Sequence, residues 1–372
     1  RPLSNSTSGQ PSRRAAAPLV VLAVVALLAA MWAGLVRMGW QLPLLRPTLP
    51  MAHGPLMVCG FLGTLVGLER AVGLSGLDSR QRWTYIGPAA TGIGSLLLVL
   101  GIAWPVGTLL IVLGSVVLVL AMVVILRIHV ALYSVVMLLG ALSWLGGNLL
   151  WMFGRSIPEV SIWWAGFLVL TIVGERLELS RLLRLSRGKQ VAFGVAVAVL
   201  VAGVLLSSVA FQAGARLTGA GMLLLAVWLL LFDIARRTVR KTGLTRYIAV
   251  ALLAGYVWLG FSGLQRLHHG GLTAGPHYDA LMHTLFVGFV FSMIFAHAPI
   301  IVPALTGWPL AYSPAFYVSL ALLQLSLLLR IAGDATLQTA VRRWGGLLNE
   351  VAILLFLVLL ALAVRRGRRQ VV

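Results

Sequence analysis

Twelve long apolar stretches constrain the fold of this chain more than any other feature. A helix that crosses a lipid bilayer needs about 20 mostly apolar residues, and its backbone polar groups must be satisfied within the helix. Stretches of this kind lie at 17–39, 53–74, 83–103, 105–127, 130–152, 158–178, 189–209, 216–234, 246–264, 278–303, 313–332 and 344–364. Hydrophobic residues make up 60% of the chain and charged residues 10%, which excludes a soluble domain. We therefore predict an all-α integral membrane protein with twelve transmembrane helices.

The basic residues predict how these helices are oriented. Most of the 29 lysines and arginines fall on one side of the predicted membrane, together with both chain ends. Cytoplasmic loops carry the excess of lysine and arginine, so both termini are predicted to be cytoplasmic in a bacterial or archaeal inner membrane. The net charge of +20 is then a topology signal and a contact for anionic lipid heads, and no nucleic-acid partner is predicted.

The predicted organisation is one membrane domain with two short tails. Residues 1–16 are predicted to be a disordered cytoplasmic tail, 17–364 a single transmembrane domain and 365–372 a basic cytoplasmic tail. The single cysteine, Cys59, excludes an internal disulfide, and no nucleotide-binding glycine loop or covalent haem-attachment motif occurs. The sequence gives no indication of the oligomeric state.

A short phrase recurs in three predicted helices and reaches an ionisable residue nine positions after its glycine. The phrases and their ninth residues are Gly60-Phe61-Leu62 with Glu69, Gly166-Phe167-Leu168 with Glu175, and Gly288-Phe289-Val290 with His297. Gly-Phe pairs alone are common in membrane helices, but self-similarity at a fixed period is the mark of a repeated unit. The phrases lie in the second, sixth and tenth helices, so the sequence predicts three pseudo-repeats of four helices each.

Two histidines hold matched positions in this scheme. His53 opens the second predicted helix and His283 lies near the start of the tenth, both on the predicted outer side. Two imidazoles that face each other across a helix bundle can provide both axial ligands of a haem iron. We interpret His53 and His283 as candidate ligands of a haem b. The alternative interpretation is that both are interfacial histidines bonded to water, loop carbonyls or lipid heads.

Copper is an alternative metal at the same end. His53 and Met57 share a helix face, Cys59 is close in sequence, and Met282 precedes His283. Imidazole, thioether and thiolate are ligands that suit copper. Methionine and cysteine are also ordinary packing residues in apolar helices, so both interpretations stay open.

The ionisable residues that follow the three phrases form a second candidate site, on the predicted inner side. Glu69, Glu175 and His297 are equivalent in the repeat, and Arg70 and Arg176 follow the two glutamates. Ionisable groups at membrane depth are functional candidates, and this set would relay protons or hold a metal ion through His297. The simpler interpretation is that each Glu-Arg pair is a neutralised charge at the lipid–water boundary.

The helical period sets a conflict between the two candidate sites. At about 100° per residue, His53 and Glu69 fall on nearly opposite faces of one helix, whereas His283 and His297 share a face of another. Both sites cannot follow one symmetry unless the helices are kinked, and Pro55 and Pro299 are candidates for such kinks.

The segments around these histidines resemble those of a known family. His53 to Gly67 (HGPLMVCGFLGTLVG) is similar to the second-helix motif of the NnrS family. Asp279 to Gly307 (DALMHTLFVGFVFSMIFAHAPIIVPALTG) is similar in layout to its tenth helix. The resemblance covers the whole topology and implies a heme-copper oxidase subunit I-like fold, association with haem and copper, and a role in the response to nitric oxide. It also implies that His53 and His283 are low-spin haem ligands.

One departure limits the chemistry that this resemblance implies. Oxidases and nitric-oxide reductases of the superfamily need histidines in their sixth and seventh helices for a second metal, and 158–178 and 189–209 contain none. The preferred hypothesis is therefore a haem-binding protein of NnrS type without the binuclear centre, active in redox chemistry, nitric-oxide response or metal handling. An extracytoplasmic electron-transfer partner would meet it at the outer loop with His268, His269 and His277.

Two other hypotheses remain open. The first is a proton-coupled secondary transporter that uses Glu69, Glu175 and His297, for which a period of six helices would be expected. The second is an assembly or scaffold protein without a cofactor, whose polar groups are all interfacial. The sequence assigns no catalytic residue.

Overall fold

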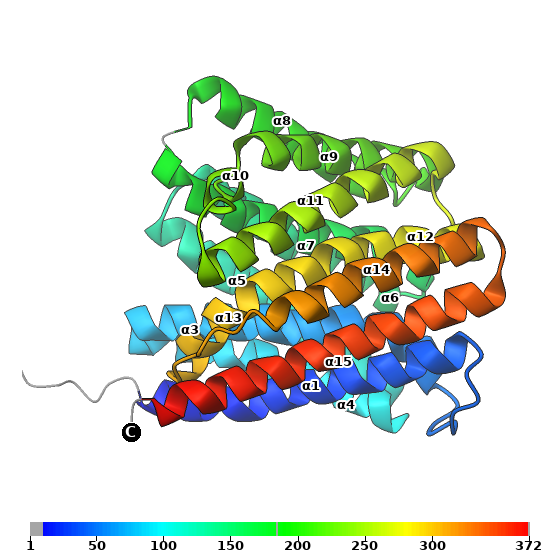
Figure 1. Ribbon diagram of the computed structural model, residues 1–372, viewed down its shortest axis with the longest axis horizontal. Coiled ribbons are helices and arrows are strands. Elements are labelled where there is room, and N and C mark those ends of the chain that lie inside the picture. The colour runs from blue at the N-terminus through cyan, green and yellow to red at the C-terminus, as the bar shows by residue number, and fades with distance from the viewer. Residues whose placement is uncertain (1–9, 184, 371–372) are drawn as a thin grey trace, which may run out of the picture. The chain divides into compact units, whose positions relative to one another are not determined.

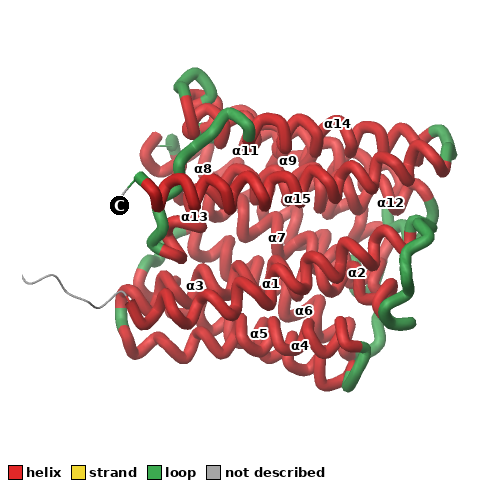
Figure 2. Tube along the Cα trace, turned by 60° about the horizontal axis from the view of Figure 1, so that its bottom comes forward, coloured by secondary structure: helices red, strands yellow, loops and turns green. Residues whose placement is uncertain are grey.

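Helix makes up most of the part of the chain that the structure describes. The computed structural model describes residues 10–183 and 185–370 (Figure 1). Loops and turns are short between most of the helices (Figure 2). Twelve helices in this part are long and apolar enough to cross a membrane, and they match the twelve predicted stretches one to one. The prediction of an all-helical protein with twelve candidate membrane spans is confirmed.

The spans are built from α-helices with shorter segments of other helix types. The α-helices are α1 (Gln10–Arg37), α2 (His53–Pro55), α3 (Thr64–Leu77), α4 (Ile86–Leu100), α5 (Trp104–Ile128), α6 (Leu132–Met152), α7 (Ile157–Ser180), α8 (Arg187–Leu206), α9 (Phe211–Phe232), α10 (Ala235–Thr238), α11 (Gly243–His269), α12 (Pro276–His283), α13 (Ser292–Thr306), α14 (Phe316–Ala335) and α15 (Thr339–Arg369). The 3₁₀ segments are η2 (Leu49–Ala52), η4 (Ser79–Tyr85) and η5 (Arg181–Leu183). The π-helical segments are η3 (Leu56–Gly63) and η6 (Thr284–Phe291).

The chain divides into two compact units. Unit 1 comprises the chain up to His129 together with Ile301–Trp308, and unit 2 comprises Val130–Ile300 and the chain from Pro309 onward. Unit 1 thus contains the first four spans. His53 belongs to unit 1, whereas His283 and His297 belong to unit 2.

Small residues bring the helices of each unit close together. In unit 1, a Cβ on Gly114 of α5 would lie 2.9 Å from the carbonyl oxygen of Gly87 in α4. In unit 2, a Cβ on Gly219 of α9 would lie 2.7 Å from the carbonyl oxygen of Gly263 in α11. Lipid tails are as apolar as leucine, so membrane helices associate through such close packing rather than through hydrophobic burial.

The junction of the third and fourth spans lies where the sequence predicted it, although no polar residue marks it. α4 ends at Leu100, and Gly101 and Ala103 then adopt left-handed backbone with φ of 67° and 45°. A left-handed glycine is a common end of a helix. α5 begins at Trp104, and Pro105 occupies its first turn, where its missing N–H costs nothing.

The helices extend into both predicted tails. α1 begins at Gln10, within the segment 1–16 that was predicted to be disordered, and residues 1–9 lie outside the described residues. At the other end α15 continues to Arg369, so most of the predicted basic tail 365–372 is helical. The first helix therefore begins before the predicted apolar stretch, with a more polar segment.

The three repeated phrases share one packing role. Gly60, Gly166 and Gly288 are all buried, and the phenylalanine that follows each is at most 4% exposed. A Cβ on Gly60 would lie 2.8 Å from Ala26 Cβ, on Gly166 2.6 Å from Ser143 Oγ, and on Gly288 2.6 Å from Trp258 Cγ. Each glycine therefore marks a close helix contact within its own unit.

Substitution of Gly60 tests this packing role, and Gly73 in the same span provides a matched control. Gly60→Ala should lower the free energy of unfolding by about 1–3 kcal/mol, because the added methyl group overpacks the contact with α1. Gly73 has open space at its Cβ position. Gly73→Ala should therefore be neutral or stabilising by up to about 1 kcal/mol, since alanine favours helix. SDS titration of the protein in detergent micelles measures both, and equal effects would contradict the assignment.

Candidate functional site

His53 is held in a defined orientation at the start of the second span. It begins α2 and is half-buried, and its Nδ1 lies 2.7 Å from the carbonyl oxygen of Ala30 in α1. A carbonyl oxygen only accepts hydrogen bonds, so Nδ1 carries the proton and donates it. In the neutral imidazole the lone pair is then on Nε2, which is the nitrogen that a metal would use.

His283 has the same tautomer and a stronger set of supporting contacts. It ends α12, is half-buried, and donates from Nδ1 to the carbonyl oxygen of Asp279 at 2.7 Å. The Asp279 carboxylate lies 3.4 Å from the same nitrogen. That carboxylate also accepts two hydrogen bonds from Arg330 of α14, at 2.7 Å from Nε and 2.8 Å from Nη2. Contacts of this kind orient histidines that ligate metals.

A π-helical segment follows each of these two histidines. η3 begins three residues after His53 and η6 begins immediately after His283, and each is eight residues long. Runs of π-helix are rare and often occur at functional sites. The phrases at Gly60 and Gly288 lie inside these segments, whereas the phrase at Gly166 lies in the regular helix α7. The second and tenth helices therefore share a distortion that the sixth lacks.

The π-helical segments also affect the sequence-based assignment of these residues to helix faces. A count at about 100° per residue assumes an unbroken α-helix. η3 lies between His53 and Glu69, and η6 lies between His283 and His297. The predicted conflict was that His53 and Glu69 fall on opposite helix faces whereas His283 and His297 share one. It does not apply as stated, because neither helix keeps the α-helical period.

His297 of α13 has the same tautomer as the other two. It is half-buried, and its Nδ1 donates to the carbonyl oxygen of Met293 at 2.7 Å. In the described residues no group of three or more His, Cys, Asp or Glu side chains is arranged to hold a metal ion. Cys59 is fully buried. Within 10–183 and 185–370 the structure thus provides oriented imidazoles but no multidentate site of those four residue types.

The charges near the repeated glutamates are paired in different ways in the two units. In unit 1, Arg70 Nη1 lies 4.0 Å from Glu69 Oε1, at a partly exposed position. In unit 2, Glu175 is half-buried, and its neighbour Arg176 pairs with Asp233, which directly follows α9. Asp233 was absent from the candidate set drawn from the sequence.

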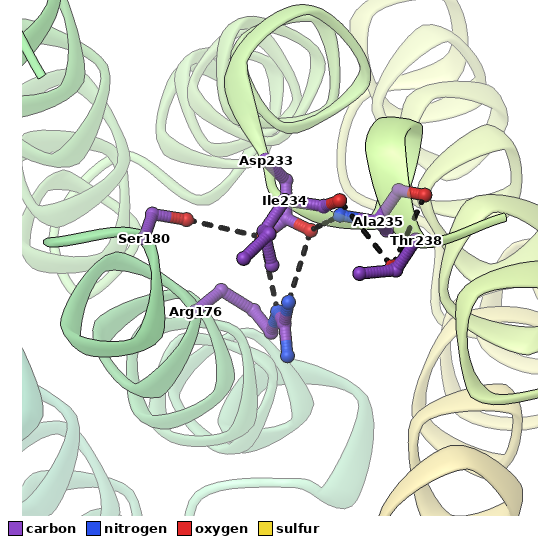
Figure 3. A network of polar contacts seen from close by, with 6 residues as sticks. All are labelled: Arg176, Ser180, Asp233, Ile234, Ala235 and Thr238. Atoms are coloured by element: carbon purple, nitrogen blue, oxygen red, sulfur yellow. Dashed lines mark hydrogen bonds and ion pairs between the residues drawn. The ribbon is translucent and has the colours of Figure 1, made fainter. Parts of the chain in front are cut away.

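Asp233 is the centre of a buried polar network (Figure 3). Arg176 donates to both of its carboxylate oxygens, at 3.1 Å from Nε and 2.9 Å from Nη2. The backbone N–H of Ala235 donates to it at 2.7 Å and the Ser180 hydroxyl at 3.4 Å. The side chains of Arg176 and Asp233 are 4% and 0% exposed. This bidentate ion pair links α7 to the residue that follows α9.

The outer histidines lie in helices rather than in the predicted loop. His268 and His269 end α11, and His277 lies in the first turn of α12. The ring centroids of His268 and His269 are 4.6 Å apart, and those of His269 and His277 are 4.7 Å apart. His268 and His277 are exposed, so they are accessible from the surface of unit 2.

α11 also buries an arginine that the sequence placed outside the membrane. The predicted helix 246–264 ended before Arg266, but α11 continues to His269. Arg266 is 2% exposed, and its Nε and Nη2 atoms have no hydrogen-bond partner in the part of the chain that the structure describes. A close α9–α11 contact at Gly219 covers its Cβ.

Comparison with known families matches nearly the whole chain. A family model described as a domain of unknown function, DUF8744, matches residues 15–365. The chain belongs to the DUF8744 family. The match begins just before the first span and ends within the twelfth. No curated protein and no solved structure matches the chain.

Several buried charges of this DUF8744 member were missed in the sequence although a signal was present. Asp233 and Arg330 both fall inside predicted spans, at 216–234 and 313–332. Ionisable residues within membrane helices are functional or structural candidates by default, and this rule alone would have selected both. Their partners lie 57 and 51 residues away in sequence, and no local pattern indicates those pairings.

Proposed function

We propose that this protein is a haem-binding integral membrane protein, and that His53 and His283 are the residues that would hold the haem through Nε2. One observation carries the proposal: the same local construction occurs at both residues. Each histidine is half-buried, donates from Nδ1 to a backbone carbonyl at 2.7 Å, and precedes an eight-residue π-helix. Two chance interfacial histidines would not be expected to share all three features.

The residues near each histidine fit a haem. Neutral imidazole with its lone pair on Nε2 is the form that binds haem iron. In both π-helical segments the side chains are almost all apolar and buried, including Phe61 and Phe289. Bound haem would supply reversible one-electron redox chemistry. The chain contributes oriented ligands, and at His283 the Asp279 carboxylate helps to fix the orientation of the ring.

We further propose the NnrS type of this function and the oxidase subunit I-like arrangement of three four-helix units. Two features support the arrangement. Unit 1 contains the first four spans, and the repeated glycines make equivalent close contacts in the second, sixth and tenth helices. The absence of histidine from α7 and α8 favours electron transfer, nitric-oxide response or metal handling over reduction of oxygen at a binuclear centre.

An optical spectrum of the purified protein tests this function. Full-length protein from haem-replete cells should show a Soret band, with sharp α and β bands after dithionite reduction, as expected of low-spin haem with two nitrogen ligands. A colourless preparation from such cells would contradict the proposal. A spectrum with a charge-transfer band from copper and no Soret band would instead support the His53, Met57 and Cys59 site.

A proton-coupled transporter is the second candidate, and one observation favours it. Unit 2 contains ionisable groups within predicted spans beyond Glu175 and His297, because Asp279 and Arg330 form a partly buried pair beside His283. Proton-coupled carriers use such groups as binding and relay sites. A colourless protein that shows substrate-driven proton uptake in proteoliposomes would support the transporter function.

A further inference from the structure

A basic cavity lies in unit 2 at the ends of several helices. Its volume is about 660 Å³, and it is bounded on one side by Leu183, Leu185 and Lys189 and on the other by residues from the end of α9 to Lys241, just after α10. Five cationic residues line it: Lys189, Arg236, Arg237, Arg240 and Lys241. All five are exposed at the surface. The sequence predicts these helix ends to be cytoplasmic.

The described residues that line the cavity include one carboxylate, and that carboxylate is already neutralised. Asp233 lines the cavity, but Arg176, Ser180 and the N–H of Ala235 occupy its oxygens. Its charge therefore offsets the buried Arg176 rather than the five lining cations. The cavity consequently has a strongly positive potential that favours an anion.

One wall of the cavity is apolar. Leu183, Leu185, Leu231 and Phe232 line it beside the cations, and Lys189 Nζ lies 4.9 Å from the centre of the Phe232 ring. Leu231 is 48% exposed on α9, at the end of a membrane span. A cationic pocket with an apolar wall at a span end matches an amphiphile with an anionic head, and matches a free anion less well.

We propose that this cavity binds the phosphodiester head of an anionic membrane phospholipid, with Arg237, Arg240 and Lys241 contacting the phosphate oxygens and Leu231 and Phe232 contacting the acyl chains. Four of the lining cations remain for the head group, Lys189, Arg237, Arg240 and Lys241, and this number favours a lipid with two phosphates over a lipid with one. Arg236 has a different role, because its Nη1 already donates to the carbonyl oxygen of Leu231 at 2.6 Å.

Lipid binding to charge variants tests the proposal. The test variant is Arg237→Gln/Arg240→Gln/Lys241→Gln in the full chain. The matched control is Arg365→Gln/Arg366→Gln/Arg369→Gln, which removes the same charge from exposed positions at the end of α15. Native mass spectrometry would measure binding of cardiolipin, phosphatidylglycerol and phosphatidylcholine to each protein in detergent micelles.

Cardiolipin should bind the wild type more tightly than phosphatidylglycerol, and phosphatidylcholine should not bind at the site. Near-surface cations contribute about 1 kcal/mol each, so the test variant should bind cardiolipin about a hundredfold more weakly. The control should bind as the wild type does. Equal weakening in both variants would overturn the proposal, because binding would then follow net charge alone. Competition by inorganic phosphate at lipid-like concentration would also overturn it, since the site would then bind the free anion.

A misfolded test variant would not be informative by itself, so Arg240→Gln/Lys241→Gln provides a second variant. Both residues are exposed and lie beyond the Asp233 network. This variant should keep the helical circular dichroism and the gel-filtration profile of the wild type and lose cardiolipin affinity by at least about tenfold. Unchanged affinity in a folded double variant would contradict the proposed phosphate contacts.

Discussion

Asp233→Asn is expected to lower the free energy of unfolding by about 3–5 kcal/mol, because it leaves the Arg176 guanidinium buried without a counter-charge. The asparagine oxygen still accepts from the Ala235 N–H, so most of the loss comes from the charge rather than from the helix end. Few single substitutions in this chain should lower the free energy of unfolding by as much, since the side chains of Arg176 and Asp233 are at most 4% exposed. SDS titration in micelles measures the change.

A double variant separates the charge from other effects of the substitution. Removing one partner of a buried pair is costly, whereas replacing the pair is often tolerated. Arg176→Met/Asp233→Asn should therefore be more stable than Asp233→Asn alone. Glu69→Gln serves as a control, because its pair with Arg70 is longer and partly exposed and should contribute at most about 1 kcal/mol. If the double variant is no more stable than the single one, the buried pair is not the source of the loss.

The second large effect is expected at the two proposed haem ligands. His53→Ala and His283→Ala should each lower the haem content of the purified protein by at least about tenfold, because even supporting residues of a metal ligand change affinity by that factor. His129 is an exposed histidine just after α5, outside the proposed site. His129→Ala should keep the full haem content, and absorbance of the reduced protein measures all three variants.

If the haem content depended on only one of the two histidines, the proposed ligand pair would be wrong. If His283→Ala lost the haem and His53→Ala kept it, another residue would provide the second ligand, and His297 has the same Nδ1-donor tautomer. If all three variants kept the wild-type spectrum, neither histidine would be a ligand.

The sequence was sufficient for the number and approximate bounds of the spans. Length and apolar composition determine whether a helix crosses a bilayer, and both are local properties. The junction near Trp104 was also predicted, and the structure shows the local features that form it: Gly101 at the end of α4 and Pro105 in the first turn of α5. Helix ends were less predictable: α11 continues to His269 and buries Arg266, because contact with α9 shields residues that composition alone places in water.

The candidate site was only partly predictable for a similar reason. The sequence singled out His53, His283 and Arg176, whose residue types are rare at membrane depth. It did not indicate the carbonyl of Ala30, the Asp279–Arg330 pair or Asp233, because these contacts join residues 23 to 57 positions apart. The π-helical segments were also missed. They depend on how a helix packs against its neighbours, and no periodicity in the sequence predicts them.

Haem stoichiometry of the purified wild-type chain is the most direct test of the central claim. A pyridine haemochrome assay on full-length protein from haem-replete cells should find haem b at one per chain, and the combined His53→Ala/His283→Ala variant should retain almost none. A wild-type chain that is folded in detergent and carries no haem would contradict the claim that His53 and His283 are haem ligands.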